Sequence, residues 1–161
     1  FGQGCASQVD WPVTEAVLKE VKLSCRHWAI KHAAGFCGTG QMMFQWKQCP
    51  SPECPQCGAN IEDASHILKC AKEVWERSIN RLWEWLVERP TDPKIIVAIC
   101  DGLSSWYLSC PTSQNLEDAE PLKWVIDEQE KLGWQAILEG CPAVGWAEIQ
   151  QHYFSCLGSR R

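Results

Sequence analysis

The chain has 161 residues, of which 45% are hydrophobic, and a formal net charge of −5. This composition is typical of a globular protein with one core, and no apolar run approaches the about 18–20 residues that a membrane-spanning helix needs. The acidic balance excludes the uniformly basic class of nucleic-acid-binding proteins. Because the first residue is Phe1 rather than Met, we expect the chain to be either processed or the ordered part of a longer protein.

The N-terminal third predicts one long helix over about residues 13–34. Thr14 is its candidate N-cap, and Gly35 ends it. Four side chains recur near helical spacing and would form its inner face: Val17, Val21, Cys25 and Trp28. The glycine-rich residues 35–40 lack the Gly-x4-Gly-Lys-Ser/Thr pattern of a phosphate-binding loop, so we predict a turn there. Residues 42–46 form a short apolar piece, and the prolines near residue 50 predict irregular backbone.

The rest of the chain predicts further helices. A helix over 71–88 carries an apolar stripe: Val74, Trp75, Ile79, Leu82, Trp83 and Leu86. The next begins at Asp92-Pro93, an N-cap followed by proline at the first helical position. Its core face consists of Ile95, Ile96, Ile99, Leu103, Trp106 and Tyr107. After a polar break at 110–115, helices are predicted over about 120–132, ending at Gly133, and about 145–157, with a short turn of helix between them.

The last of these helices has four side chains that we expect to point inward: Trp146, Ile149, Tyr153 and Phe154. No alternating strand pattern and no repeat is present, so the fold is predicted to be mainly α. We expect a helical region over 1–110, with a small zinc-stapled segment at about 49–70, and a C-terminal helical region over 111–161 packed on it. The ten tryptophans are expected mostly in the core, although a surface for stacking bases or a ligand stays open.

One short segment has the spacing of a metal site. Cys54 and Cys57 are two residues apart, His66 follows after eight residues, and Cys70 after three more. The Cys-Pro-x-Cys-Gly turn places two thiols together, and Gly58 tolerates a positive φ there. His66 and Cys70 stand at i and i+4 of a helix that either Asp63 or Asn60 caps, so they share a face. Three thiolates and an imidazole predict a closed, structural zinc site.

Cys49 is a competing ligand upstream of this segment. Eight cysteines remain outside the set: Cys5, Cys25, Cys37, Cys49, Cys100, Cys110, Cys141 and Cys156. An even number allows complete pairing, but the helical, core-rich character favours reduced, buried thiols in an intracellular protein. We expect a nuclear or cytoplasmic location, or an organellar one if the N-terminus is processed.

No arrangement of residues predicts an enzyme. His27 and His32 are five residues apart, a poor spacing for shared ligands on a helix, and His152 stands alone. The adjacent acids Glu62-Asp63 and Glu117-Asp118 diverge on a helix. We interpret each pair as a helix cap or a solvated face.

The charge is distributed unevenly, which leaves a nucleic-acid contact open. Five basic residues lie in the N-terminal third: Lys19, Lys22, Arg26, Lys31 and Lys47. The segment 117–130 holds six acidic residues and one basic residue. The basic third predicts local binding of RNA or DNA, while a solvated helix face explains the same residues.

The metal segment resembles the zinc-binding region that follows the polymerase domain of retrotransposon reverse transcriptases. The resemblance rests on Cys54-Pro-Gln-Cys57-Gly, Glu62-Asp63, His66-Ile-Leu, Cys70 and Trp75. Shorter matches are Lys31-His32, Gly35-Phe36-Cys37, Met42-Met43 and Thr91-Asp92-Pro93. The resemblance as a whole covers about residues 31–106. The resemblance implies that Cys54, Cys57, His66 and Cys70 are metal ligands and that the ancestor was associated with nucleic acid. No Asp-Asp pair of a polymerase is present.

The sequence therefore predicts a non-catalytic zinc-binding helical module that contacts nucleic acid through its basic N-terminal third. The alternative is an architectural subunit of a larger protein assembly, built from a repurposed retroelement fragment. The acidic net charge and the many tryptophans favour this alternative.

Overall fold

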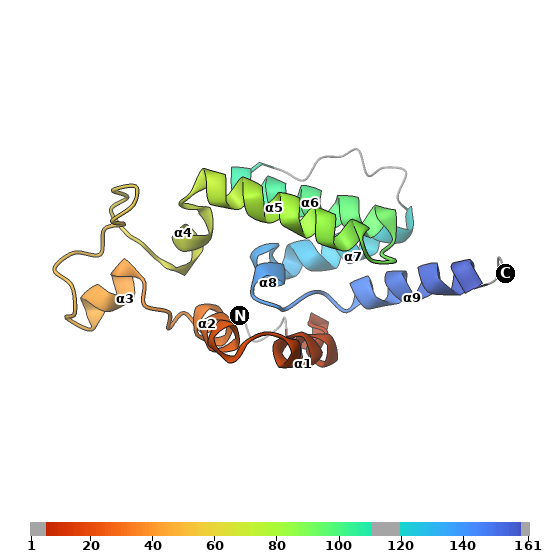
Figure 1. The fold of residues 1–161 in the computed structure, drawn as a ribbon, viewed down its shortest axis with the longest axis horizontal. Helices are drawn as coiled ribbons and strands as arrows, with labels where there is room; N and C mark the ends of the chain where they lie inside the picture. Colours follow the sequence, from red (N-terminus) through yellow and green to blue (C-terminus); the bar gives the residue numbers. More distant parts are fainter. Residues whose placement is uncertain (1–5, 111–119, 159–161) are drawn as a thin grey trace. The chain divides into compact units, whose positions relative to one another are not determined.

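The computed structural model of the chain describes residues 6–110 and 120–158. This part of the chain is helical (Figure 1) and contains no strand beyond a single antiparallel bridge between Val9 and Ala143. The elements in order are a 3-10 turn η1 (Ala6–Gln8), α1 (Trp11–Glu20), α2 (Leu23–Ala33), α3 (Gly40–Gln45), α4 (Ala64–Lys69), α5 (Lys72–Val87), α6 (Pro93–Leu108), α7 (Glu120–Leu132), α8 (Gln135–Leu138) and α9 (Gly145–Gly158). The prediction of a mainly α fold is confirmed.

The chain divides into two compact units. Unit 1 comprises Phe1–Val17 and Ile79–Arg161, and unit 2 comprises Leu18–Ser78, which includes the whole metal segment. The division does not fall between residues 110 and 111, where we expected a boundary, because α6 packs against α7 and α9 within unit 1. The predicted linker beyond Cys110 lies outside the described residues. Among the helices that the structure describes, none is both long and apolar enough to cross a membrane.

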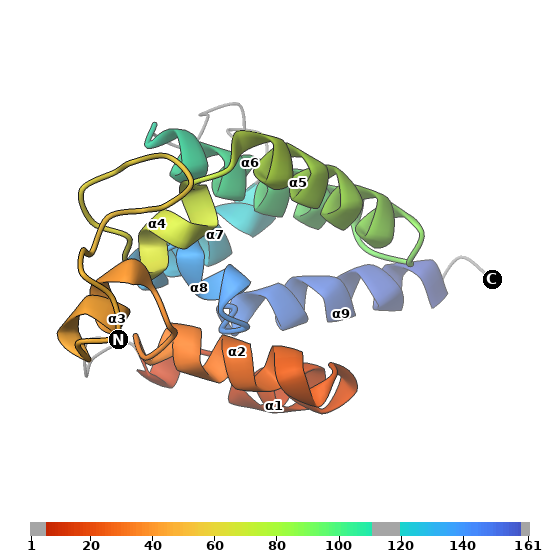
Figure 2. The same ribbon diagram turned by 60° about the vertical axis from the view of Figure 1, so that its left-hand side comes forward.

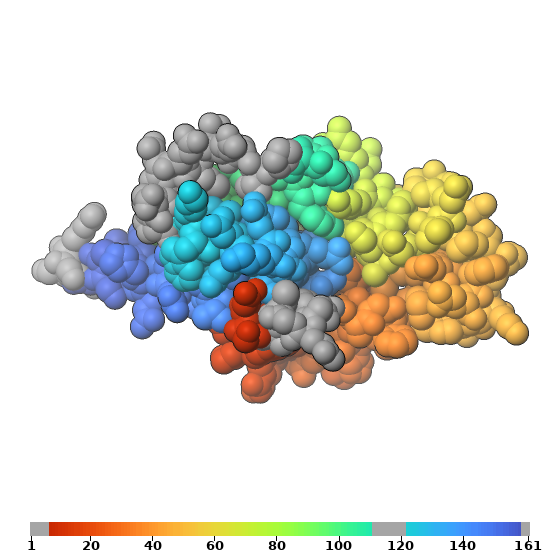
Figure 3. Space-filling view, turned by 180° about the vertical axis from the view of Figure 1, so that it is seen from behind, coloured from red at the N-terminus to blue at the C-terminus, as the bar shows by residue number. Residues whose placement is uncertain are grey.

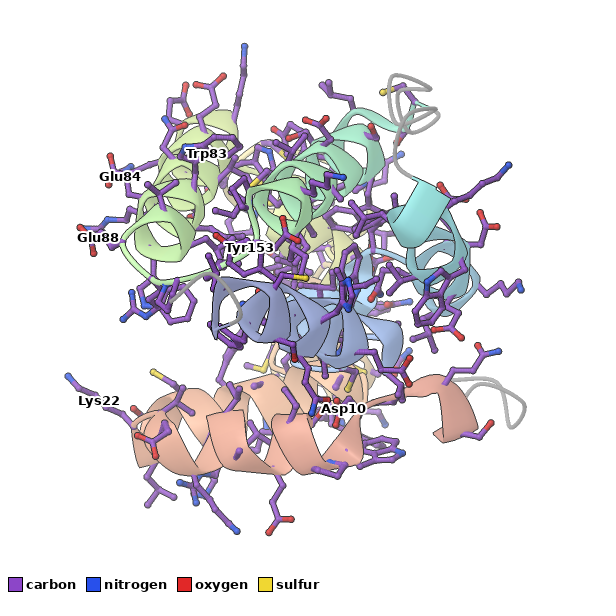
Figure 4. The ribbon with its side chains drawn as sticks, turned by 90° about the vertical axis from the view of Figure 1, so that its right-hand side faces the viewer. Asp10, Lys22, Trp83, Glu84, Glu88 and Tyr153 are labelled. Carbon is purple, nitrogen blue, oxygen red and sulfur yellow. The ribbon has the colours of Figure 1, made fainter. Side chains whose placement is uncertain are left out.

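Unit 1 has an apolar core between α6, α7 and α9. Its fully buried large side chains are the aliphatic Leu103, Leu122 and Val125 and the amide of Gln129. The 79–87 part of α5 runs alongside α6 (Figures 1 and 2), and Leu86 is buried. Figure 4 shows Glu84 and Glu88 on the outer side of α5, whereas Tyr153 lies on the side of α9 that faces α5 and α6. Of the side chains predicted to point inward from α9, Trp146 is buried as expected, whereas Phe154 is exposed.

Local signals set the ends of these helices. The Asp92 carboxylate accepts a hydrogen bond from the Lys94 amide at 2.9 Å, and Pro93 occupies the first turn of α6 as predicted. Ser109 ends α6 in the left-handed conformation. Gly133, with φ of 85°, follows α7 directly, also as predicted. The N-terminal segment joins unit 1 through the Val9–Ala143 bridge and lies beside the residues around α8 in Figure 3.

The single helix expected over 13–34 is wrong, because two helices occupy this range. Lys22 is extended, with φ of −54° and ψ of 144°, and separates α1 from α2. The Arg26 guanidinium donates a hydrogen bond to the Lys19 carbonyl at 3.1 Å, which satisfies an acceptor at the end of α1. Thr14 does not cap the helix. It lies buried within α1, while the Asp10 carboxylate accepts from the Val13 amide at 3.0 Å.

The apolar pattern also misled us about which side chains are buried. The four residues of the predicted inner face, Val17, Val21, Cys25 and Trp28, are all exposed. Of the tryptophans in the described chain, Trp134 and Trp146 are buried, but six are at least 39% exposed: Trp11, Trp28, Trp46, Trp83, Trp85 and Trp124. Val74 and Trp83 of the α5 stripe are exposed as well. The expectation that most of the tryptophans lie in the core is therefore wrong.

The described cysteines form no disulfide. Three of those outside the four predicted ligands are buried, as we expected: Cys37, Cys100 and Cys141. Cys25, Cys110 and Cys156 are exposed, and Cys49 is half-buried. The prediction of buried thiols therefore holds for only part of the set.

Candidate metal centre

The four predicted ligands come together in unit 2. The ligand atoms of Cys54, Cys57, His66 and Cys70 all lie within 4.8 Å of one another. Two of the separations are 3.5 Å, between the sulfurs of Cys54 and Cys70, and 3.3 Å, from Cys57 Sγ to His66 Nε2. A tetrahedral ion with bonds of about 2.3 Å to sulfur and about 2.0–2.1 Å to nitrogen places two sulfurs about 3.8 Å apart and a sulfur and a nitrogen about 3.6 Å apart. The two separations above are shorter than these values by about 0.3 Å, so the group could hold a metal ion after small shifts of its side chains.

A tight turn holds the first two thiols. The Cys54 amide donates to the Ala59 carbonyl and the Gly58 amide to the Cys54 carbonyl, both at 2.9 Å. Gly58 has φ of 73°, a left-handed conformation that glycine adopts without strain. The turn confirms the role predicted for this glycine. It buries the Cys54 side chain and leaves Cys57 exposed.

Helix α4 supplies the other two ligands. Asp63 is its N-cap, and the carboxylate accepts a hydrogen bond from the backbone amide of His66 at 2.7 Å. The choice left open between Asp63 and Asn60 is thus settled in favour of Asp63. His66 and Cys70 lie one turn apart on the same face, and Cys70 is the C-cap of α4. The hydrogen bond from His66 to the N-cap Asp63 therefore fixes the backbone of a ligand directly.

Two residues outside the motif position α4 and the loop before it, which Figure 2 shows between α3 and α4. The buried His32 of α2 places Nε2 2.8 Å from the Ala64 carbonyl, which accepts a hydrogen bond from the ring. The Glu62 carboxylate accepts from the Gly40 amide at 2.6 Å, at the start of α3. A Cβ at Gly40 would lie 2.8 Å from the Pro52 carbonyl oxygen, so this approach requires glycine. These contacts tie α2 and α3 to the metal segment.

Sequence reasoning did not identify these two supports. In the sequence, His32 stands out only beside His27 and in the Lys31-His32 match to the retrotransposon region, and Glu62 only as one of an acidic pair. Their partners are 32 and 22 residues away, a distance at which spacing carries no signal. Of the two interpretations given for Glu62-Asp63, a helix cap or a solvated face, the cap applies to Asp63, whereas the Glu62 carboxylate accepts from the distant Gly40 amide.

The thiols of the group have different acidities. A hydrogen bond from the Ala59 amide lowers the pKa of Cys57. Desolvation, with hydrogen bonds to the sulfurs of Cys54 and Cys57, raises the pKa of Cys70 to about 12. Neighbouring thiolates repel one another when no cation lies between them, and a bound metal ion reverses this effect. The group is therefore one that releases protons when it binds a cation.

Cys49 lies outside the four-residue group. Its thiol donates to the Ser51 carbonyl at 3.1 Å and lies 3.6 Å from the Gly40 carbonyl. These contacts place it in the loop that supports α3. The described residues contain no second group of three or more metal-ligating side chains.

The basic residues of the N-terminal third do not gather on one helix face. Lys22, Lys31 and Lys47 are exposed, as is Lys19. Arg26 is half-buried and binds the Lys19 carbonyl, so it serves the α1–α2 connection. Arg26 and Lys31 are about 140° apart around α2. A nucleic-acid contact through all five residues stays a prediction.

The ligand set limits the chemistry of the centre. A tetrahedral ion bound by all four residues would have no open position for a substrate or an activated water. Comparisons with protein-family models, curated proteins and solved structures give no match to this chain, so the resemblance to the retrotransposon region rests on its motif residues.

Proposed function

We propose that the chain is a non-catalytic zinc-binding helical module in which zinc on Cys54, Cys57, His66 and Cys70 folds unit 2. The observation that carries this proposal is the near absence of an apolar core in that unit. Residues 18–78 are all described, and only His32, Cys37, Thr39 and Cys54 are buried. None of these is a large hydrocarbon side chain.

Nine large apolar side chains of unit 2 are instead exposed: Val21, Leu23, Trp28, Ile30, Phe36, Phe44, Trp46, Ile61 and Val74. The other large ones, among them Ile67, Leu68 and Trp75, are half-buried. Hydrophobic burial is the dominant favourable term in folding, and it is small here. A structural zinc ion contributes on the order of 10 kcal/mol of apparent binding free energy, which is enough to replace a core in a segment of this size.

Zinc is the metal that this ligand set favours. Thiolate and imidazole ligands suit zinc better than magnesium or calcium, which prefer oxygen. The protein as purified should contain one zinc ion per chain by elemental analysis. Cys54→Ser should lose it, whereas Cys49→Ser should keep it, because Cys49 bonds to carbonyl groups outside the site. Equal zinc contents in the two variants would contradict the ligand assignment.

As the biological role we propose binding of nucleic acid by unit 2. Residues 18–78 hold eight basic and six acidic residues, a net charge of +2, whereas the rest of the chain holds seven basic and fourteen acidic residues, a net charge of −7. The exposed Lys22, Lys31 and Lys47 provide contacts to phosphate. RNA and DNA affinity of the zinc-loaded protein should fall steeply with salt and fall further when these three lysines are changed to glutamine. An affinity that does not depend on salt would contradict this role.

A specific observation favours a second candidate, a subunit of a larger protein assembly. Six tryptophans are substantially exposed, and tryptophan is enriched in the centres of protein interfaces. In that case the chain co-purifies from its native source in a fixed stoichiometry with other proteins. A tagged chain that elutes as a monomer from such an extract would count against this candidate.

A further inference from the structure

A second His-x3-Cys pair lies on α9. His152 and Cys156 are both exposed, and the separation of His152 Nε2 and Cys156 Sγ is 3.6 Å. The first such pair, His66 and Cys70, belongs to the metal centre described above, on α4. Both pairs use the i and i+4 positions, which stand on one face of a helix. Unit 1 thus repeats half of the ligand set of unit 2.

The geometry of this pair fits a tetrahedral ion. Bonds of about 2.3 Å to sulfur and about 2.0–2.1 Å to nitrogen, at an angle of about 109°, place the two atoms about 3.6 Å apart. The separation on α9 matches this value, and no change of helix geometry is needed for both atoms to bind one ion. Without an ion, the same separation allows a weak hydrogen bond between the thiol and the imidazole.

The pair provides only half of a tetrahedral shell. No third His, Cys, Asp or Glu ligand joins it, since the described part of the chain holds one group of three or more, and that group is in unit 2. Two ligands on a solvent-facing helix leave two positions of the ion unfilled. A second copy of the chain, related by a two-fold axis, supplies the same two residues and completes a Cys2His2 set, which is a common structural zinc site.

We propose that His152 and Cys156 form half of a second zinc site, which closes when the same pair of a second chain binds the same ion. The site links two copies of α9 through zinc. It is independent of the centre in unit 2, since the two share no residue, and its failure would leave the function proposed above untouched.

The test is sedimentation equilibrium of the full chain with its first centre already loaded with zinc, in the presence of a reductant that prevents disulfides. Addition of zinc should convert the monomer to a dimer that holds three zinc ions in place of the two that two separate monomers hold. The combined variant His152→Ala and Cys156→Ser should remain a monomer with one zinc ion per chain. Both residues are exposed, so this variant should fold normally, which circular dichroism checks.

A matched control comes from α2, where Cys25 and His27 are also exposed but stand two residues apart, on different faces. The variant Cys25→Ser and His27→Ala should dimerise with zinc as the unchanged chain does. Replacement of zinc by cobalt adds a spectroscopic readout, because a tetrahedral Cys2His2 ion absorbs visible light and this extra absorption should be missing from the α9 variant. Zinc uptake without a change of mass, or dimerisation that survives in the α9 variant, would overturn the proposal.

Discussion

The side-chain oxygen of Gln129 accepts a hydrogen bond from the indole Nε1 of Trp146 at 3.0 Å, and both side chains are buried. The same oxygen accepts from the Ala143 amide at 3.0 Å, and the Gln129 amide donates to the Gly133 carbonyl at 3.1 Å. One fully buried amide thus joins the end of α7 to the start of α9. Because buried polar groups are costly when unpaired, this contact fixes how the two helices meet.

Replacement of Gln129 should be among the most damaging changes in unit 1. Gln129→Leu keeps most of the volume but leaves the Ala143 amide, the Trp146 indole and the Gly133 carbonyl without their partner. We expect the free energy of unfolding to fall by about 2–4 kcal/mol, measured by urea denaturation. Gln151→Leu, at an exposed position of α9, is the control and should change stability by less than about 0.5 kcal/mol. Similar effects of the two changes would contradict the role of Gln129.

Gly102 allows close packing between α6 and Trp134. A Cβ at this position would lie only 2.2 Å from the Trp134 ring, so we expect Gly102→Ala to lower the melting temperature and to cost about 1–3 kcal/mol. Gly158→Ala, where no atom lies within 4 Å of the added carbon, is the control. The atoms in contact belong to the six-membered part of the indole, so Trp134→Phe should recover part of the loss in the double variant. A Gly102→Ala protein with unchanged melting would show that the two groups are not in contact.

Removal of the metal should act on unit 2 alone. A zinc chelator should abolish the protection of amides against hydrogen exchange in residues 18–78, including those of Gly58 and His66, because this unit has almost no apolar core to hold them. Amides of α6 and α7, which surround the core of unit 1, should keep their protection. Cys54→Ser should produce the same pattern without the chelator. Uniform loss of protection, or none, would contradict an unfolding confined to unit 2.

The supports of α4 should affect zinc affinity without binding the ion themselves. We expect His32→Ala and Asp63→Ala each to weaken zinc binding about 10–100-fold, as outer partners of metal sites commonly do, since they release the Ala64 carbonyl and the His66 amide. Competition with a coloured chelator measures the affinity. His27→Ala is the control, because His27 is exposed on the same helix as His32. Equal affinities in the three variants would mean that the ligands hold their geometry unaided.

Alkaline pH should destabilise unit 1 through Cys100. Burial raises the pKa of this thiol from 9.0 to about 11, with a smaller contribution from the charge of Asp101. Below about pH 9 both the folded and the unfolded states keep the proton, and the stabilisation is complete. Between about pH 9 and pH 11 the unfolded thiol ionises first, so stability falls. Urea denaturation at pH 8 and pH 10.5 should therefore show a smaller alkaline loss for Cys100→Ala than for Cys110→Ala, whose thiol is exposed.

Local chemistry was predictable from the sequence. The turn after Cys54, the cap at Asp92 with Pro93 behind it, and the end of α7 at Gly133 each depend on residues within one turn of one another, and all were predicted correctly. The spacing of the metal ligands depends on one loop and one short helix. Such features need no knowledge of the remaining chain.

What could not be predicted was which surfaces of the helices are covered. Val17 and Trp28 have the spacing of core residues, yet both are exposed, because a helical period shows that a face is apolar but not what packs on it. Gln129 lies among charged residues in the sequence and no pattern marked it as a core residue, yet it is fully buried. Its burial depends on α9, which begins 16 residues later in the sequence. These errors share one cause, since the environment of each residue is set by segments distant in the chain.

The scarcity of buried side chains in unit 2 has a consequence for sequence variation. Where few side chains fill a shared interior, few positions are constrained by their volume or shape. Substitutions in α2 and α3 can accumulate there with little effect on folding, provided that the four ligands, His32, Gly40, Glu62 and Asp63 are kept. Related chains should therefore differ most in this unit and still share its framework, while unit 1 should change slowly and through compensating pairs.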